Sequence, residues 1–221
     1  TSATGTQHPS DYIETRKGIR WKEGSINQRK YKGDFTMKMH IIGTGTATVS
    51  KYINTSCVFE EDDQLFLVDG TGGSDILRAF DTMNLNWKKL HYAFLSHEHT
   101  DHFLGMIWVI RTIAELLELE EYEGDFYLYG NDVVLGKVLH VCRMILKKRS
   151  QAFLETRIKF VLVKDHERKH ILNYDFTFFD IGSTKAKQYG FLMEYDNGKK
   201  LVFAGDEPLK ENGKKYIVRY H

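Results

Sequence analysis

A buried strand that runs straight into a cluster of histidines is the feature of this sequence that most restricts its fold. Residues 92–95 read Tyr-Ala-Phe-Leu, and the next seven residues, Ser-His-Glu-His-Thr-Asp-His, lead into the apolar pattern of a helix. Three imidazoles and a carboxylate within six residues are costly to bury unless a cation compensates them. The segment therefore predicts a metal site where a strand meets a helix.

The spacing within this segment indicates how the four side chains can divide between metal ions. Side chains two residues apart in an extended chain project to the same side, so His97 and His99 can share one ion. Asp101 and His102 lie at the turn into the helix and can reach a second ion. The alternative interpretation is a solvated strand-to-helix turn that merely happens to be rich in histidine.

From Met37 onward the sequence alternates between strand and helix patterns. We expect helices at residues 74–83, 103–119 and 132–148, with Asn131 capping the last of them. This mixture predicts an α/β domain over residues 37–221, with helices on the outer faces of its sheets. We expect strands at residues 39–42, 56–60, 65–68, 92–95, 126–129, 159–163, 176–181, 189–195 and 201–204.

Residues 1–36 are polar and carry little apolar periodicity. They fit a native N-terminal arm and an unrelated leader joined in front of Met37 equally well.

Composition narrows the functional classes. The 221 residues suit one domain, and a formal net charge of +1 gives no global field that would draw the chain to nucleic acid or to an anionic membrane. No apolar run approaches the roughly 20 residues that a membrane helix needs, and we expect no membrane partner. Two cysteines, Cys57 and Cys142, cannot form a disulfide framework, which favours a reducing, cytoplasmic setting.

The four residues His97, His99, Asp101 and His102 spell His-x-His-x-Asp-His, and in this the sequence resembles the metallo-β-lactamase superfamily. The resemblance extends over about residues 37–209. It implies an αββα sandwich of two β-sheets with outer helices, here with the last elements missing. It also implies two metal ions, with zinc expected first and manganese or iron as alternatives.

Two further aspartates enter through the resemblance. Residues 65–70 look like the family strand that ends in an acid supporting the metal histidines, so Asp69 is expected to accept a hydrogen bond from one of them. Residues 201–206 are similar to the strand whose terminal aspartate bridges two metals, so Asp206 is expected to be a ligand. The early Gly-Thr-Gly and the later Tyr-Gly-Phe at 189–191 look most like ribonuclease Z and its phosphodiesterase relatives.

The sequence departs from the family pattern at two expected histidines. Gly182 stands where one ligand should be, and glycine cannot coordinate through a side chain. The chain ends 15 residues after Asp206, before the position of the last family histidine, and His221 follows too closely to be a secure replacement. Truncation, degeneration or replacement of these ligands all remain open at this level.

The resemblance implies a hydrolase that uses a metal-activated water, with Asp101 orienting the nucleophile or handling its proton. A phosphodiester, with RNA in first place, is the expected substrate, and small-molecule esters, lactones, thioesters or β-lactams are alternatives. A homo-oligomer stays open. The competing hypothesis is a family member without catalysis that serves as a binding or structural module.

A weaker alternative is a metal site at residues 166–170, which have the spacing His-Glu-x-x-His. Such a site would need a helix, but these residues are flanked by strand-like residues and are expected to be a hairpin loop.

Overall fold

Two β-sheets dominate the computed structural model, which describes residues 12–15, 18–21, 37–195 and 198–206. A six-stranded sheet has the order β3-β4-β5-β6-β7-β8, and a four-stranded antiparallel sheet has the order β12-β11-β10-β9. A separate antiparallel pair is formed by β1 and β2. The strands are β1 (Tyr12–Thr15), β2 (Gly18–Trp21), β3 (Lys38–Gly43), β4 (Ser56–Glu61), β5 (Gln64–Val68), β6 (Leu90–Leu95), β7 (Phe126–Gly130), β8 (Ile158–Leu162), β9 (Arg168–Ile171), β10 (Tyr174–Asp180), β11 (Tyr189–Tyr195) and β12 (Lys199–Phe203).

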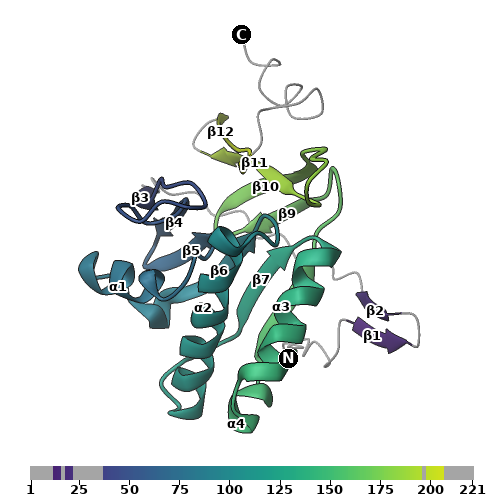
Figure 1. The fold of residues 1–221 in the computed structure, drawn as a ribbon. Coiled ribbons are helices and arrows are strands. Elements are labelled where there is room, and N and C mark those ends of the chain that lie inside the picture. Colours follow the sequence, from purple (N-terminus) through teal and green to yellow (C-terminus); the bar gives the residue numbers. More distant parts are fainter. Residues whose placement is uncertain (1–11, 16–17, 22–36, 196–197, 207–221) are drawn as a thin grey trace, which may run out of the picture.

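The main helices cover one face of the six-stranded sheet, and the four-stranded sheet packs on the other (Figure 1). In α3 the Asn131 side chain accepts hydrogen bonds from the backbone amides of Val133 and Val134, as the sequence predicted for a helix cap. The helices are α1 (Asp75–Thr82), η1 (Trp87–Lys89), α2 (Thr100–Glu118), α3 (Asp132–Ile145) and α4 (Lys148–Gln151).

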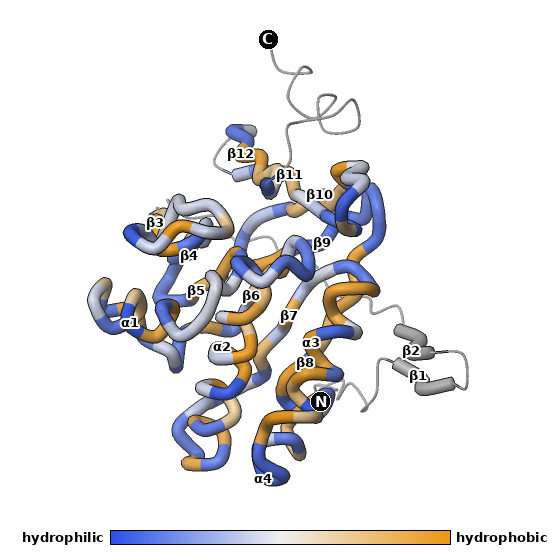
Figure 2. The backbone as a smooth tube through the Cα atoms, in the orientation of Figure 1, coloured by the Kyte–Doolittle hydropathy of each residue, from blue (hydrophilic) through white to orange (hydrophobic). Residues whose placement is uncertain are grey.

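Alternation along the central strands builds two separate apolar cores. In β4, Val58 points to the helices while Phe59 points to the second sheet, and both are buried. Figure 2 shows hydrophobic residues, in orange, along the central strands and, in turn with hydrophilic ones, along the helices that cover them. Because both faces of β5 to β7 are covered, these strands read as continuous apolar runs, which is why the sequence identifies them well.

The parallel part of the sheet determines where a site can form. Strands β5, β6, β7 and β8 run parallel, so the loops after them emerge at one edge. Asp69, Ser96 and Asn131 are the first residues after β5, β6 and β7. Polar side chains that are distant in sequence therefore meet at this edge.

The loop after β5 and the first turns of α2 touch through two glycines. The amide of Gly70 donates to the carbonyl of His102 (2.8 Å), and the amide of Gly105 donates to the carbonyl of Thr71 (3.0 Å). A Cβ atom built on Gly105 would lie 1.5 Å from the carbonyl oxygen of Gly70. Only glycine permits this approach, which fixes the start of α2 against the end of β5.

Two sequence predictions were wrong in detail. Residues 166–170 are neither a helix nor a hairpin loop, because His166 lies in a turn between the sheets and Arg168 begins edge strand β9. The helix expected over 132–148 ends at Ile145, since Leu146 is extended (ψ 152°) and α4 then begins separately at Lys148. Within the described residues, no helix combines the length and the apolarity needed to cross a membrane.

Candidate metal centre

The histidine-rich segment lies where β6 passes into α2. Residues 96–99 belong to neither element, His99 has an extended backbone, and α2 begins at Thr100, which puts Asp101 and His102 in its first turn. The side chains of Asp101 and His102 are 5% and 0% exposed, whereas His99 is exposed. The chain thus places two ligand-type side chains before the helix and two within its first turn.

The four side chains of this motif converge. Nε2 of His97 lies 2.9 Å from Nδ1 of His99. Oδ2 of Asp101 lies 3.3 Å from Nε2 of His102. The rings of His97 and His102 are 4.4 Å apart between centroids. These distances place the three imidazoles and the carboxylate next to one another.

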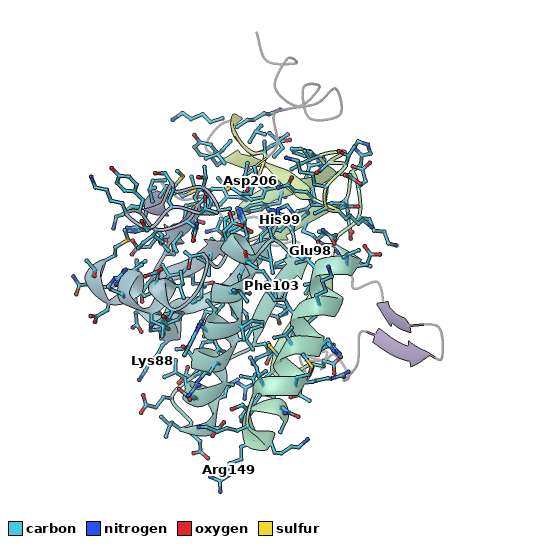
Figure 3. All side chains as sticks on the ribbon, in the orientation of Figure 1. Lys88, Glu98, His99, Phe103, Arg149 and Asp206 are labelled. Carbon is cyan, nitrogen blue, oxygen red and sulfur yellow. The ribbon has the colours of Figure 1, made fainter. Side chains whose placement is uncertain are left out.

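Asp206 reaches the same place from the second sheet. It follows Gly205 just beyond β12, and its Oδ2 lies 2.9 Å from Nε2 of His102, 104 residues earlier in the chain. One ligand atom each from His97, His102 and Asp206 lie within 4.8 Å of one another. Figure 3 shows the labelled Asp206 and His99 at the same end of the molecule. Asp206 thus lies against His102, and its expected role as a metal ligand stays a prediction.

Asp69 lies behind the histidines and is fully buried. Its Oδ2 accepts from Nδ1 of His102 (2.8 Å) and from the hydroxyl of Ser96 (2.9 Å), while its Oδ1 accepts from the backbone amide of Ser96 (2.8 Å). In neutral His102 this contact would hold the proton on Nδ1 and leave the lone pair of Nε2 toward the centre. Asp69 also has a left-handed backbone (φ 59°), which aspartate adopts more readily than most residues other than glycine.

Two polar side chains that sequence reasoning missed complete the surroundings of His97. The Ser96 hydroxyl lies 2.9 Å from Nδ1 of His97, and the side-chain amide of Gln188 lies 3.1 Å from the same atom. Ser96 could have been found from its place between a buried strand and the motif. Gln188 could not have been found from the sequence, because its contact with His97 depends on how the two sheets pack.

The charged and buried groups of the site shift one another's pKa values. Burial by itself lowers the pKa of His102, but the carboxylates of Asp69 and Asp206 raise it to about 10. The hydrogen bond from His102 lowers the pKa of Asp206 even though burial opposes this shift. Burial lowers the pKa of His97 against the opposing charge of Asp69. An incoming cation would therefore have to displace a proton from His102.

At Gly182, one of the two positions that depart from the family pattern, the chain offers no side-chain ligand. Gly182 has a left-handed backbone (φ 73°), and its amide donates to Oδ1 of Asp180 at 2.8 Å. Its loop is closed by a hydrogen bond from the Ile181 amide to the Gln188 carbonyl (2.9 Å). The position of His221 lies outside the described residues.

The donor set fits a first-row divalent cation. Imidazole nitrogens and carboxylate oxygens are the ligands that Zn(II) takes in catalytic sites, and Mn(II) and Fe(II) accept the same types. Carboxylate support of a histidine, as Asp69 gives His102, is typical of such centres. His97, His102 and Asp206 can each offer one ligand atom to an ion, and His99 and Asp101 lie beside them.

Comparison with known proteins identifies the family of this chain. A family model described as "Anti-Pycsar protein Apyc1" matches residues 37–220. The chain belongs to this family. It is also similar to ribonuclease Z of Bacteroides fragilis, with 35% identity over 81 residues, which are 36% of this chain and 26% of that enzyme. The Apyc1-family chain thus aligns with only about a quarter of the length of that relative.

Solved structures share the fold of this Apyc1-family chain. The metallo-β-lactamase fold protein YhfI of Bacillus subtilis superposes with a TM-score of 0.59 at 20% identity, over 77% of this chain and 63% of YhfI. The short form of human tRNase Z superposes with a TM-score of 0.59 at 15% identity, over 81% of this chain and 72% of the human one. The fold is therefore of the metallo-β-lactamase type, as the motif implied.

Proposed function

We propose that this protein is a metal-dependent hydrolase that cleaves phosphodiesters with a metal-activated water. The observation that carries the proposal is the approach of Asp206 to His102 across 104 residues of sequence, at 2.9 Å. A stable fold has no need to gather three imidazoles and two carboxylates at one sheet edge. Their collection at the edge where α/β proteins bind ligands supports a reactive centre.

Each side chain has a distinct part in the proposal. His97 and His99 would hold one cation, and Asp101 and His102 would hold the other, with Asp206 as a further ligand next to His102. A bound cation pair supplies a water of lowered pKa and stabilises negative charge on a phosphoryl oxygen. The nearly buried carboxylate of Asp101 orients the attacking water or takes its proton. Asp69 keeps His102 in the tautomer that presents Nε2.

The substrate class is inferred from the relatives. Ribonuclease Z and tRNase Z are named for the cleavage of RNA, and both resemble this chain in sequence or in fold. RNA is therefore the first phosphodiester to test. The net charge of +1 offers no general attraction to a polyanion, so binding would depend on contacts near the centre.

The test compares substrates and metals in purified protein. Hydrolysis of bis(p-nitrophenyl) phosphate and of a short RNA is measured with Zn(II), Mn(II) or Fe(II), beside a β-lactam and a lactone. We expect phosphodiester cleavage that is lost in Asp101→Asn. The matched control His166→Asn changes a half-exposed histidine of the same sequence outside the centre and should retain activity. Cleavage of only the β-lactam or the lactone would contradict the proposed substrate class.

The second candidate function, a binding or structural module without catalysis, is favoured by Gly182. That position supplies no side-chain ligand, so the donor set is incomplete for two ions. Metal analysis separates the two candidates. Two equivalents of metal per chain support the hydrolase, and one or none, together with no turnover on any of the four substrates, supports the module.

A further inference from the structure

Gln188 is a buried polar side chain that the proposed chemistry does not use. It is 2% exposed and precedes the first residue of β11. Its amide lies 3.1 Å from Nδ1 of His97 and packs against Gly205, where an added Cβ would come within 2.7 Å of Nε2. Gln188 therefore contacts the motif histidine and the residue next to Asp206. A buried amide in such a place needs its hydrogen bonds met.

The backbone on both sides of Gln188 is held firmly. The amide of Tyr189 donates to the carbonyl of Ser96 (3.1 Å), and the side chain of Asn131 donates to the carbonyl of Lys187 (3.0 Å). These bonds attach the start of β11 to the loops after β6 and β7. The Gln188 side chain is thus aimed at His97 by the packing of the two sheets.

The neighbours of His97 determine which contact Gln188 can make when a metal is present. The carboxylate of Asp69 can only accept, so the hydroxyl of Ser96 donates to it and is left as an acceptor toward Nδ1 of His97. This arrangement places the His97 proton on Nδ1. Nε2, which faces His99, then has a free lone pair for a cation.

An Nδ1–H group cannot accept a hydrogen bond, so the Gln188 amide has to present its oxygen to it, and the N–H is then shared between Ser96 and Gln188. A half-turn of the amide about its Cγ–Cδ bond brings Oε1 to the place that Nε2 occupies, at 3.1 Å from His97. In the opposite orientation the amide nitrogen would donate to Nδ1 and leave the proton on Nε2, where it blocks the metal. The two amide orientations therefore correspond to the two tautomers of a neutral His97.

We propose that Gln188 is a positioning residue that holds His97 in its metal-binding tautomer through the amide oxygen. This inference rests on the proposed function, because it assigns Gln188 a part in loading the same centre. Partners behind a metal-binding histidine typically change metal affinity by about 10- to 100-fold. Gln188 should therefore control affinity without touching the metal.

The experiment measures Zn(II) affinity at pH 8 and the ¹⁵N signals of the His97 ring in metal-free protein. Gln188→Leu removes the acceptor at similar volume and should weaken Zn(II) binding by about 10-fold or more. Gln188→Glu keeps an acceptor and should bind Zn(II) at least as well as the original protein. Both variants should shift the His97 ring signals.

The matched control is Gln151→Leu. Gln151 is the last residue of α4, and its side chain donates to the backbone carbonyls of Arg143 (2.9 Å) and Leu146 (2.6 Å). Arg149 of the same helix lies at the end of the molecule opposite His99 (Figure 3). The Gln151→Leu variant should be less stable than the original protein, while its Zn(II) affinity and its His97 signals stay unchanged. A Gln188→Leu variant with unchanged affinity, or equal weakening in Gln188→Leu and Gln188→Glu, would overturn the proposal.

Failure of the proposed function can be told apart from failure of this inference. If the original protein binds none of Zn(II), Mn(II) and Fe(II), the hydrolase proposal fails, and the ring signals of metal-free His97 still report on Gln188. Signals that move in both Gln188 variants and not in Gln151→Leu would then support the positioning contact. Signals that do not move would refute it.

Discussion

Replacing Asp69 by asparagine tests how far the centre depends on one buried carboxylate. Asparagine has nearly the same shape and tolerates the left-handed backbone of this position (φ 59°), so the change isolates the chemistry. At Oδ2 the carboxylate accepts from Ser96 and from His102, and an amide nitrogen in that place can accept from neither. Hydrogen bonds to charged groups contribute about 1.5 to 3 kcal/mol each. We therefore expect the free energy of unfolding of the metal-free protein to fall by about 3 to 6 kcal/mol.

The same change should weaken Zn(II) binding by about 10- to 100-fold, because His102 loses the partner that fixes its tautomer. Urea unfolding followed by circular dichroism measures the stability, and competitive titration with a chromophoric chelator measures the affinity. Asp63→Asn is the control, since Asp63 is also left-handed (φ 65°) but is 72% exposed and only pairs with Lys89. It should change stability by at most about 1 kcal/mol and leave Zn(II) affinity unchanged. Asp69→Asn with a stability loss below about 1 kcal/mol and unchanged affinity would refute the reasoning.

Three other predictions follow from single positions. Gly182→His should raise Zn(II) stoichiometry if this is the place of the absent ligand, at a cost of about 1 to 2 kcal/mol for a side chain at φ 73°, and equal titrations of both proteins would exclude the position. Gly105→Ala should destabilise by about 2 kcal/mol or more in thermal unfolding because its Cβ would collide with Gly70, whereas Gly136→Ala, with open space around it, should stabilise by about 0.5 to 1 kcal/mol. Burial lowers the pKa of His102 but its carboxylate partners raise it to about 10, so Zn(II) must displace a proton below that pH. Affinity should rise by about tenfold per pH unit between pH 7 and 9, and a flat profile would contradict the raised pKa.

The sequence predicted those parts of the fold in which burial produces a recognisable run of apolar residues. The strands of the central sheet are covered on both faces and appear as apolar runs, and the dense ligand motif of residues 97–102 marked the centre. Strand β9 was missed because an edge strand pairs through its backbone and keeps charged side chains such as Arg168. The Asp206 approach was inferred from family resemblance. Gln188 had no signal at all, since its contact with His97 arises only when the two sheets pack.

The separation of Asp206 from the motif has a consequence for how the molecule holds together. A cation shared by His102 and Asp206 would close a loop of about a hundred residues and tie the four-stranded sheet to the start of α2. Any ion that binds the folded chain and not the unfolded one adds its binding free energy to stability. Removal of the cation by a chelator would then break this link. The packing of one sheet on the other would weaken before either sheet loses its own hydrogen bonds.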